Sequence, residues 1–127
     1  MSNKNKQPLA TPPSGAGGLK IYIAGKVTGE PLAECTMKFG LAQKTIENLG
    51  FIAINPLEVV GDWKTPWNEA MRKCLHALID CDAIVLLNDW QDSKGAMIEQ
   101  QLAQDLKLRM IVAPDKIETL KLPQWNN

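Results

Sequence analysis

The sequence predicts an α/β fold in which helices flank a parallel sheet, and three observations indicate it. Short apolar runs rich in β-branched residues recur along the chain, segments of helical periodicity separate them, and the run at residues 83–87 (AIVLL) is apolar throughout. A fully apolar strand is typical of a sheet covered on both faces, and alternation of strand and helix indicates right-handed βαβ units. We therefore expect a flavodoxin-like or Rossmann-like parallel sheet of four to five strands.

The first half of the chain supplies two of these strands and a helix. Residues 19–24 (LKIYIA) are β-branched and aromatic and stop at Gly25, which predicts the first strand. Apolar residues then recur at helical spacing over residues 32–49, and Gly50 stands where a glycine commonly ends a helix. Residues 51–54 form the second apolar run, so this half predicts strand, helix, strand.

The second half repeats the alternation. Thr65-Pro66 has the form of an N-cap followed by proline at the first helical position, and apolar residues from Trp67 to Cys81 then fall on one helical face. The apolar run at residues 83–87 is the third strand. Ser93 suits the N-cap of the next helix, and residues 110–113 (MIVA) are the fourth strand.

The length of the chain, 127 residues, suits one such domain and not two, so we predict a single α/β domain over residues 19–127. Residues 1–18 are rich in Pro, Gly, Ser, Asn and Lys and predict a disordered leader without the apolar segment of a signal peptide. Residues 114–127 either pack as a tail or add a short element.

The composition excludes several classes of function. Lys and Arg equal Asp and Glu at 14 each, which gives no electrostatic reason to expect binding to a nucleic acid polymer or to an anionic membrane. No apolar run approaches the roughly 20 residues that span a bilayer. Three cysteines without CxxC spacing indicate reduced, mostly buried thiols and a cytoplasmic protein, and a single histidine argues against a His-centred metal site.

The most informative residue is Glu99. On the helix after the third strand it falls within the apolar stripe that must face the sheet, where a carboxylate is costly unless it is paired or reaches a pocket. Burial would raise its pKa toward neutrality, where it could act as a nucleophile or as an acid or base. The alternatives are a salt bridge to Arg72 or Lys26, or a side chain that reaches solvent at the edge. The stripe comprises Gly95, Ala96, Leu102, Ala103 and Leu106.

Ligands of parallel sheets bind at the carboxyl ends of the strands, so the functional loops are expected at residues 25–31, 55–65 and 88–95. Three segments in and around these loops carry a recognisable pattern: YIAGKVTG at residues 22–29, CDAIVLLNDW at residues 81–90, and Ser-x-Gly-x-x-x-Glu from Ser93 to Glu99. Over residues 20–112 the chain resembles the nucleoside 2-deoxyribosyltransferase superfamily, and within it the small proteins of the DUF4406 type.

The resemblance implies glycosyl transfer at a nucleoside or nucleotide. Glu99 would attack the anomeric carbon of the sugar, and Tyr22 would help to position it. Ser93 stands where the related deoxynucleotide N-glycosidases use a serine on the 5′-phosphate, which favours nucleotide hydrolysis. The resemblance implies no cofactor and no metal, and it implies assembly as a homodimer or higher homo-oligomer.

One position departs from the family pattern. Cys74 stands where these enzymes usually carry a catalytic aspartate, and a thiol protonates a leaving base less readily than a carboxylic acid does. Asp82 is our candidate for a compensating catalytic residue, with local capping or pairing at the start of its strand as the alternative. The other carboxylates close by in sequence are Asp80, Asp89 and Asp92.

The candidate substrate-binding residues lie in the strand-end loops. Lys26 and Thr28 could contact a phosphate, and Trp90 could stack on a nucleobase better than Trp67, which we expect in the core. Each candidate also has a structural interpretation that needs no ligand. Lys26 could be a solvated lysine, a tryptophan could pack in the core, and the glycines could serve a tight turn. Asn55-Pro56 could form a turn, and Ser93 could be an N-cap. The full set is Gly25, Lys26, Thr28, Gly29, Asn55, Trp90, Ser93 and Gly95.

These observations give one leading hypothesis and two alternatives. The leading one is an N-glycosidase or transferase that acts on a (deoxy)nucleoside or its 5′-monophosphate, a small-molecule partner. The first alternative is a nucleotide-binding module that senses or sequesters its ligand without turnover, which Cys74 favours. The second is a protein-interaction subunit that uses the fold alone and binds no small molecule.

Overall fold

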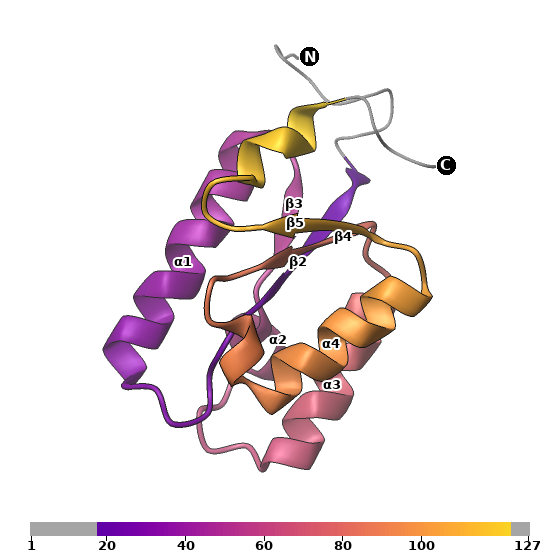
Figure 1. Cartoon of the computed structure of the whole chain (residues 1–127). Helices are drawn as coiled ribbons and strands as arrows, with labels where there is room; N and C mark the ends of the chain where they lie inside the picture. The colour runs from indigo at the N-terminus through magenta and orange to yellow at the C-terminus, as the bar shows by residue number, and fades with distance from the viewer. Residues whose placement is uncertain (1–17, 123–127) are drawn as a thin grey trace.

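The computed structural model describes residues 18–122 and contains a four-stranded, all-parallel sheet in the order β3-β2-β4-β5 (Figure 1). The strands are β2 (Lys20–Ala24), β3 (Ile52–Ile54), β4 (Ala83–Leu86) and β5 (Arg109–Val112). The predicted α/β parallel sheet is therefore confirmed. The predicted leader lies outside the described residues, apart from Gly18.

Helices cover both faces of the sheet. Helix α1 (Leu32–Asn48) lies on one face, and α3 (Trp67–Ile79) and α4 (Lys94–Asp105) lie on the other (Figure 1). Gly50 has a φ of +96° just after the C-cap of α1, a conformation that glycine adopts readily, so it ends this helix as predicted.

The core consists of two apolar layers, one on each side of the sheet. The layer under α1 includes Ile21, Ile23 and Phe39, and the opposite layer includes Tyr22 and Leu78. Alternate residues of β2 thus point to opposite faces, as the two-residue period of a strand requires. All four residues of β4 are buried, which confirms the prediction drawn from its apolar run.

Two boundaries differ from the sequence predictions. Pro66 is the N-cap of α3 and not its first helical residue, and no side chain caps that helix. Leu106 lies at the C-cap of α4, beyond the last full turn, and is 45% exposed, so it is not part of the buried stripe.

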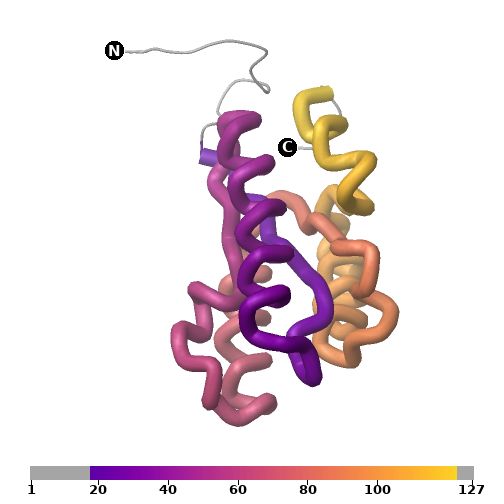
Figure 2. The backbone as a smooth tube through the Cα atoms, turned by 90° about the vertical axis from the view of Figure 1, so that its left-hand side faces the viewer, coloured from indigo at the N-terminus to yellow at the C-terminus, as the bar shows by residue number. Residues whose placement is uncertain are grey.

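Three short helical elements complete the fold: α2 (Pro56–Val60), η2 (Trp90–Asp92) and η3 (Ile117–Lys121). The first lies within a segment that we predicted as loop. The third resolves the alternative left open for the tail, because Ile117 and Leu120 are buried in the layer under α1. Figure 2, which looks from the side of α1, shows η3 beside the upper part of this helix.

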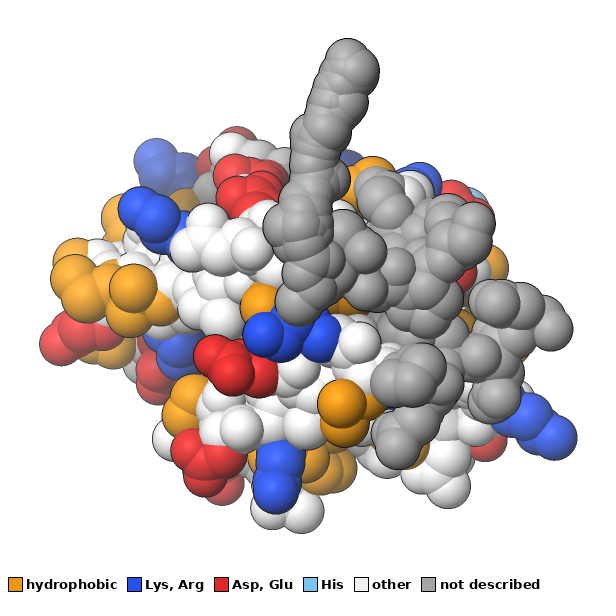
Figure 3. Space-filling model, turned by 90° about the horizontal axis from the view of Figure 1, so that it is seen from above, with side chains coloured by type: hydrophobic (Ala, Val, Ile, Leu, Met, Phe, Trp, Pro, Cys, Tyr) orange, Lys and Arg blue, Asp and Glu red, His pale blue; other side chains and the backbone are white. Residues whose placement is uncertain are grey.

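The surface carries charges of both signs. In Figure 3, which views the molecule from above, separate basic and acidic side chains lie among apolar ones, and no large area carries one sign of charge alone. Among residues 18–122, no helix combines the length and apolar character needed to cross a membrane.

Candidate functional site

A cavity of about 550 Å³ opens at the carboxyl ends of the strands. All three loops that we predicted to be functional contribute to its lining, through residues such as Thr28, Trp63 and Ser93. The first turns of α4 supply Gly95, Ala96 and Glu99, and α3 supplies the opposite wall. The cavity thus lies where parallel sheets commonly bind ligands.

Glu99 lies in the wall of this cavity and is 5% exposed. The hydroxyl of Tyr22 donates a hydrogen bond of 2.7 Å to its Oε2 atom. Burial raises the pKa of Glu99 to about 7, and the hydrogen bond from Tyr22 opposes that rise. Within residues 18–122 no cation pairs with Glu99, so the alternative salt bridges to Arg72 and Lys26 do not form.

Tyr22 is fully buried on β2, directly beneath the cavity wall. Burial, followed by the negative charge of Glu99, raises the pKa of Tyr22 well above its ordinary value. The phenol therefore remains protonated near neutral pH and keeps its proton for the bond to Glu99. Its place on β2, one of the two inner strands of the sheet, fixes the direction of that bond.

Cys74 lines the cavity from α3 and lies near both Tyr22 and Glu99. Burial raises the pKa of its thiol to about 11. The side chain is therefore a neutral thiol at physiological pH, and it is neither an activated nucleophile nor an effective acid.

The N-terminus of α4 faces the cavity beside these groups. The Oγ atom of Ser93 accepts a hydrogen bond of 3.1 Å from the N–H of Ala96, which confirms the predicted N-cap. The N–H groups of Lys94 and Gly95 have no acceptor within the described part of the chain. Free N–H groups at a helix N-terminus suit an anion.

Gly25 controls how closely the first loop approaches the sheet. A Cβ atom at this position would lie 2.7 Å from Cδ1 and 3.0 Å from Cβ of Leu87, which is too close for an undistorted packing. The glycine therefore allows the loop after β2 to pass over the end of β4. Val27, Thr28 and Gly29, which follow it, all line the cavity.

We expect Gly25→Ala to cost about 1–3 kcal/mol of unfolding free energy, because Leu87 or the loop must move to admit the methyl group. Urea denaturation measures this loss. Gly40→Ala on α1 is the matched control, because a Cβ atom there meets nothing within 4 Å and should gain up to about 1 kcal/mol. An equal response of the two variants would contradict the close approach at Gly25.

Two tryptophans lie at the cavity: Trp63, which is 47% exposed, and Trp67, which is 41% exposed. The exposure of Trp67 contradicts its predicted place in the core. The Lys94 ammonium lies 4.9 Å from the centre of the Trp67 ring, which holds a cation next to the cavity. Trp90, the predicted stacking residue, does not line the cavity and packs against the core layer under α3 and α4.

The structure brings most of the predicted site together. Tyr22 is bonded to Glu99, and the predicted residues that line the cavity with Glu99 are Gly25, Thr28, Gly29, Ser93 and Gly95.

Three other predicted residues lie elsewhere. Asn55 caps α2 through a 2.9 Å bond from the N–H of Leu57 and donates to Gln43, so its turn interpretation fits. Asp82 lies at the amino end of β4, the end opposite the cavity, and accepts a 2.8 Å bond from the N–H of Lys20. Lys26 does not line the cavity; its backbone is bound by other side chains.

Two further residues were missed. Asp62 lines the cavity from the loop after α2, where its Oδ1 atom accepts a bond from the N–H of Lys64. Lys38, on α1, donates a hydrogen bond to the carbonyl oxygen of Lys26 in the loop after β2. A sequence signal for Lys38 existed, because it lies three residues after Cys35 and four before Ala42, on the buried side of α1.

The model of a family described as a domain of unknown function (DUF4406) matches residues 19–112. The chain belongs to the DUF4406 family. A comparison with curated proteins finds no match. The DUF4406 segment contains all four strands and every cavity residue described above, and it leaves η3 outside.

Proposed function

We propose that this protein cleaves the N-glycosidic bond of a (deoxy)nucleoside 5′-monophosphate or nucleoside, with Glu99 as the nucleophile. The observation that carries the proposal is the buried Glu99 carboxyl in a cavity wall, held by Tyr22 and without a cationic partner among the described residues. Burying a glutamate in this environment lowers the stability of the fold, and such groups with shifted pKa values occur frequently at catalytic sites.

The reaction would proceed in two displacements. The Glu99 carboxylate attacks C1′ of the sugar, the bond between C1′ and the base nitrogen breaks, and its electron pair leaves with the base, which takes a proton from solvent or a nearby acid. Water, or a second base, then attacks C1′ of the glycosyl ester and releases the Glu99 carboxylate. With its pKa near 7, about half of Glu99 is ionised at neutral pH.

The rest of the cavity fits the parts of a nucleotide. Trp63 and Trp67 offer aromatic surface to a base. Ser93 and the free N–H groups of Lys94 and Gly95 would bind the 5′-phosphate at the N-terminus of α4. On this pattern we place the DUF4406 family within the nucleoside 2-deoxyribosyltransferase-like superfamily. The three free, buried cysteines support our proposal that the protein is cytoplasmic.

The second candidate is a nucleotide-binding module without turnover, and Cys74 is the observation that favours it. This neutral thiol lines the cavity at the position where the resemblance implies a catalytic aspartate that would protonate the leaving base. Asp89 cannot replace that acid, because it is bound to Lys38 outside the cavity. Among the described residues Asp62 is the other carboxylic acid in the cavity lining, and it would supply the proton if turnover occurs.

A chromatographic assay of base release tests the proposal. The wild type and Glu99→Ala are incubated with ribo- and deoxynucleosides and their 5′-monophosphates. Release by the wild type alone would support the enzyme and name its substrate. Binding without release would support the module, and neither binding nor release would exclude both for the compounds tested.

The pH profile should shift when Tyr22 is replaced by phenylalanine. In the wild type, kcat/KM should rise with pH through about 7, because the carboxylate is the reactive form. The hydrogen bond from Tyr22 lowers the pKa of Glu99, so Tyr22→Phe should raise that pKa and move the midpoint upward by about one pH unit. A midpoint that stays in place or falls would contradict the assigned role of Tyr22.

We also propose, from the resemblance, that the protein forms a homodimer or a larger homo-oligomer. Exposed apolar side chains such as Met37 and Leu41 on α1 are of the kind that an interface covers. Light scattering after size-exclusion chromatography tests this, and a monomer at micromolar concentration would contradict it.

A further inference from the structure

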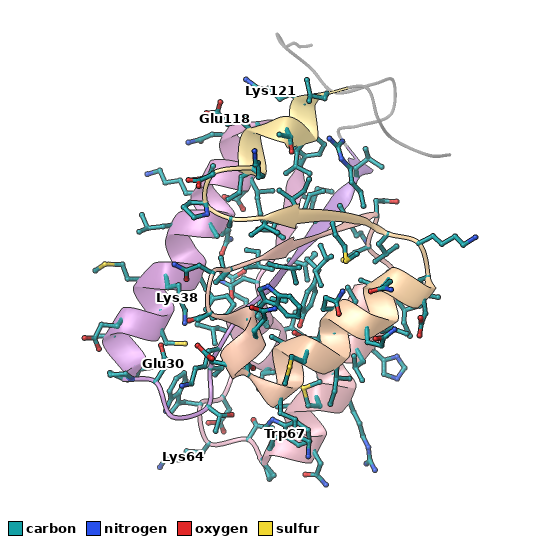
Figure 4. All side chains as sticks on the ribbon, in the orientation of Figure 1. Glu30, Lys38, Lys64, Trp67, Glu118 and Lys121 are labelled. Carbon is teal, nitrogen blue, oxygen red and sulfur yellow. The ribbon has the colours of Figure 1, made fainter. Side chains whose placement is uncertain are left out.

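Lys38 binds three acceptors behind the loop that follows β2. Its Nζ atom lies 2.8 Å from the carbonyl oxygen of Lys26, 3.2 Å from Oε1 of Glu30 and 2.6 Å from Oδ2 of Asp89. An ammonium group has three protons, so these acceptors satisfy it fully. Figure 4 shows Lys38 on α1, with Glu30 near the start of the same helix.

Asp89 completes the arrangement from the end of β4. Its Oδ2 atom pairs with Lys38, and its Oδ1 atom accepts a 3.0 Å bond from the N–H of Lys26. Both polar groups of the Lys26 backbone are therefore held by partly buried charged side chains. Charge-assisted hydrogen bonds of this kind are stronger than neutral ones.

Lys26, whose backbone is held in this way, lies between two residues of the cavity wall. Gly25 precedes Lys26 and packs against Leu87, and Val27 follows it into the cavity lining. Beyond them, Thr28 and Gly29 also line the cavity, and a turn closes with the bond from the N–H of Glu30 to the carbonyl of Val27. The direction in which this loop enters the cavity is thus set at Lys26.

We propose that Lys38 and Asp89 are positioning residues that hold the loop at residues 25–29 in the conformation that binds the 5′-phosphate. The inference rests on the proposed function, because it assigns the loop to the phosphate of that substrate. Neither residue lines the cavity, so both act through the backbone of Lys26. Within residues 18–122, the N–H groups of Val27, Thr28 and Gly29 have no acceptor, which leaves them free for phosphate oxygens.

The charges of this pair do not titrate where Glu99 does. Burial disfavours the charged forms, but the hydrogen bonds and opposite charges around the two side chains together outweigh it, those with Glu30 and the N–H of Lys26 included. The pKa of Asp89 is therefore lowered and that of Lys38 is raised. Loss of the pair should therefore leave the pH midpoint of turnover near 7 and weaken binding of the phosphate.

Affinity measurements on paired ligands test the inference. Dissociation constants for each 2′-deoxynucleoside and its 5′-monophosphate are measured by quenching of tryptophan fluorescence, since Trp63 and Trp67 line the cavity. Lys38→Met and Asp89→Ala should each weaken monophosphate binding by about tenfold or more, while nucleoside binding changes by less than about threefold. The double variant should resemble the single ones, because each breaks the same unit.

Two matched variants provide controls. Asp89→Asn keeps an acceptor for the N–H of Lys26 and should recover part of the monophosphate affinity that Asp89→Ala loses. Lys73→Met removes a lysine from the exposed pair with Glu69 on α3 and should leave both affinities unchanged. In turnover, KM for the monophosphate should rise in the Lys38 and Asp89 variants more than kcat falls.

Equal weakening of nucleoside and monophosphate binding, or none, would overturn the inference even if the enzyme turns over. Absence of any nucleotide binding by the wild type would overturn the proposed function and this inference together. Hydrogen exchange reports on the loop without a ligand: Asp89→Ala should speed exchange at the Lys26 amide by about tenfold or more and leave α4 unchanged. Unchanged exchange there would contradict the arrangement itself.

Discussion

Glu99→Gln is expected to lower the rate of base release by about a thousandfold or more, while nucleotide affinity stays within about threefold of the wild type. The amide has nearly the shape of the carboxyl group and can still accept the bond from Tyr22, so the cavity should keep its form. It cannot attack C1′, so the first displacement stops. Single-turnover kinetics and a binding titration with the same nucleotide measure the two effects.

Asp105→Asn is the matched control for this substitution. It also converts one carboxylate of α4 to an amide, but on an exposed position that does not line the cavity. Turnover by Asp105→Asn should equal that of the wild type. If Glu99→Gln released base at a rate within about tenfold of the wild type, Glu99 would not be the nucleophile.

Glu99→Gln should also raise the stability of the protein relative to the wild type at high pH. The folded state holds the pKa of Glu99 at about 7 against an ordinary value of 4.5, so between these values the folded state binds more protons than the unfolded state. The free energy of unfolding therefore falls as pH rises through this window. At about 1.4 kcal/mol for each unit of pKa, the full loss is on the order of 3–4 kcal/mol.

Glutamine does not titrate, so Glu99→Gln lacks this loss. Measured by urea denaturation, its stability relative to the wild type should increase by about 2–3 kcal/mol from about pH 4.5 to about pH 8. Asp105→Asn again controls for the removal of one negative charge. A constant difference between Glu99→Gln and the wild type across this range would mean that burial does not raise the pKa of Glu99.

The polar residues on buried faces show what the sequence can predict of the site. Glu99 was found because apolar neighbours three and four residues away place it on the sheet side of its helix. The same rule applies to Lys38, which lies between Cys35 and Ala42 on the buried side of α1. A lysine in such a stripe is a weaker signal of function than a glutamate, because its long side chain can reach solvent. Here it binds three acceptors instead.

Asp82 and Trp67 lie away from their expected places for different reasons. Asp82 precedes the third strand, so the direction of the chain already places it at the amino end of the sheet, opposite the end where ligands bind. The pattern placed Trp67 on the apolar side of its helix, but as the first residue of α3 it extends past the sheet to the cavity. The fold itself was predictable, because the apolar runs, their spacing and the stop at Gly50 all agree.

Intact-protein mass spectrometry of a quenched reaction tests the central claim most directly, together with the anomeric configuration of the product trapped by methanol. We predict a glycosyl adduct that maps to Glu99, and a methyl glycoside with the configuration of the substrate retained, because two displacements at C1′ restore it. Base release with an inverted product, or an adduct on another residue, would contradict the role of Glu99.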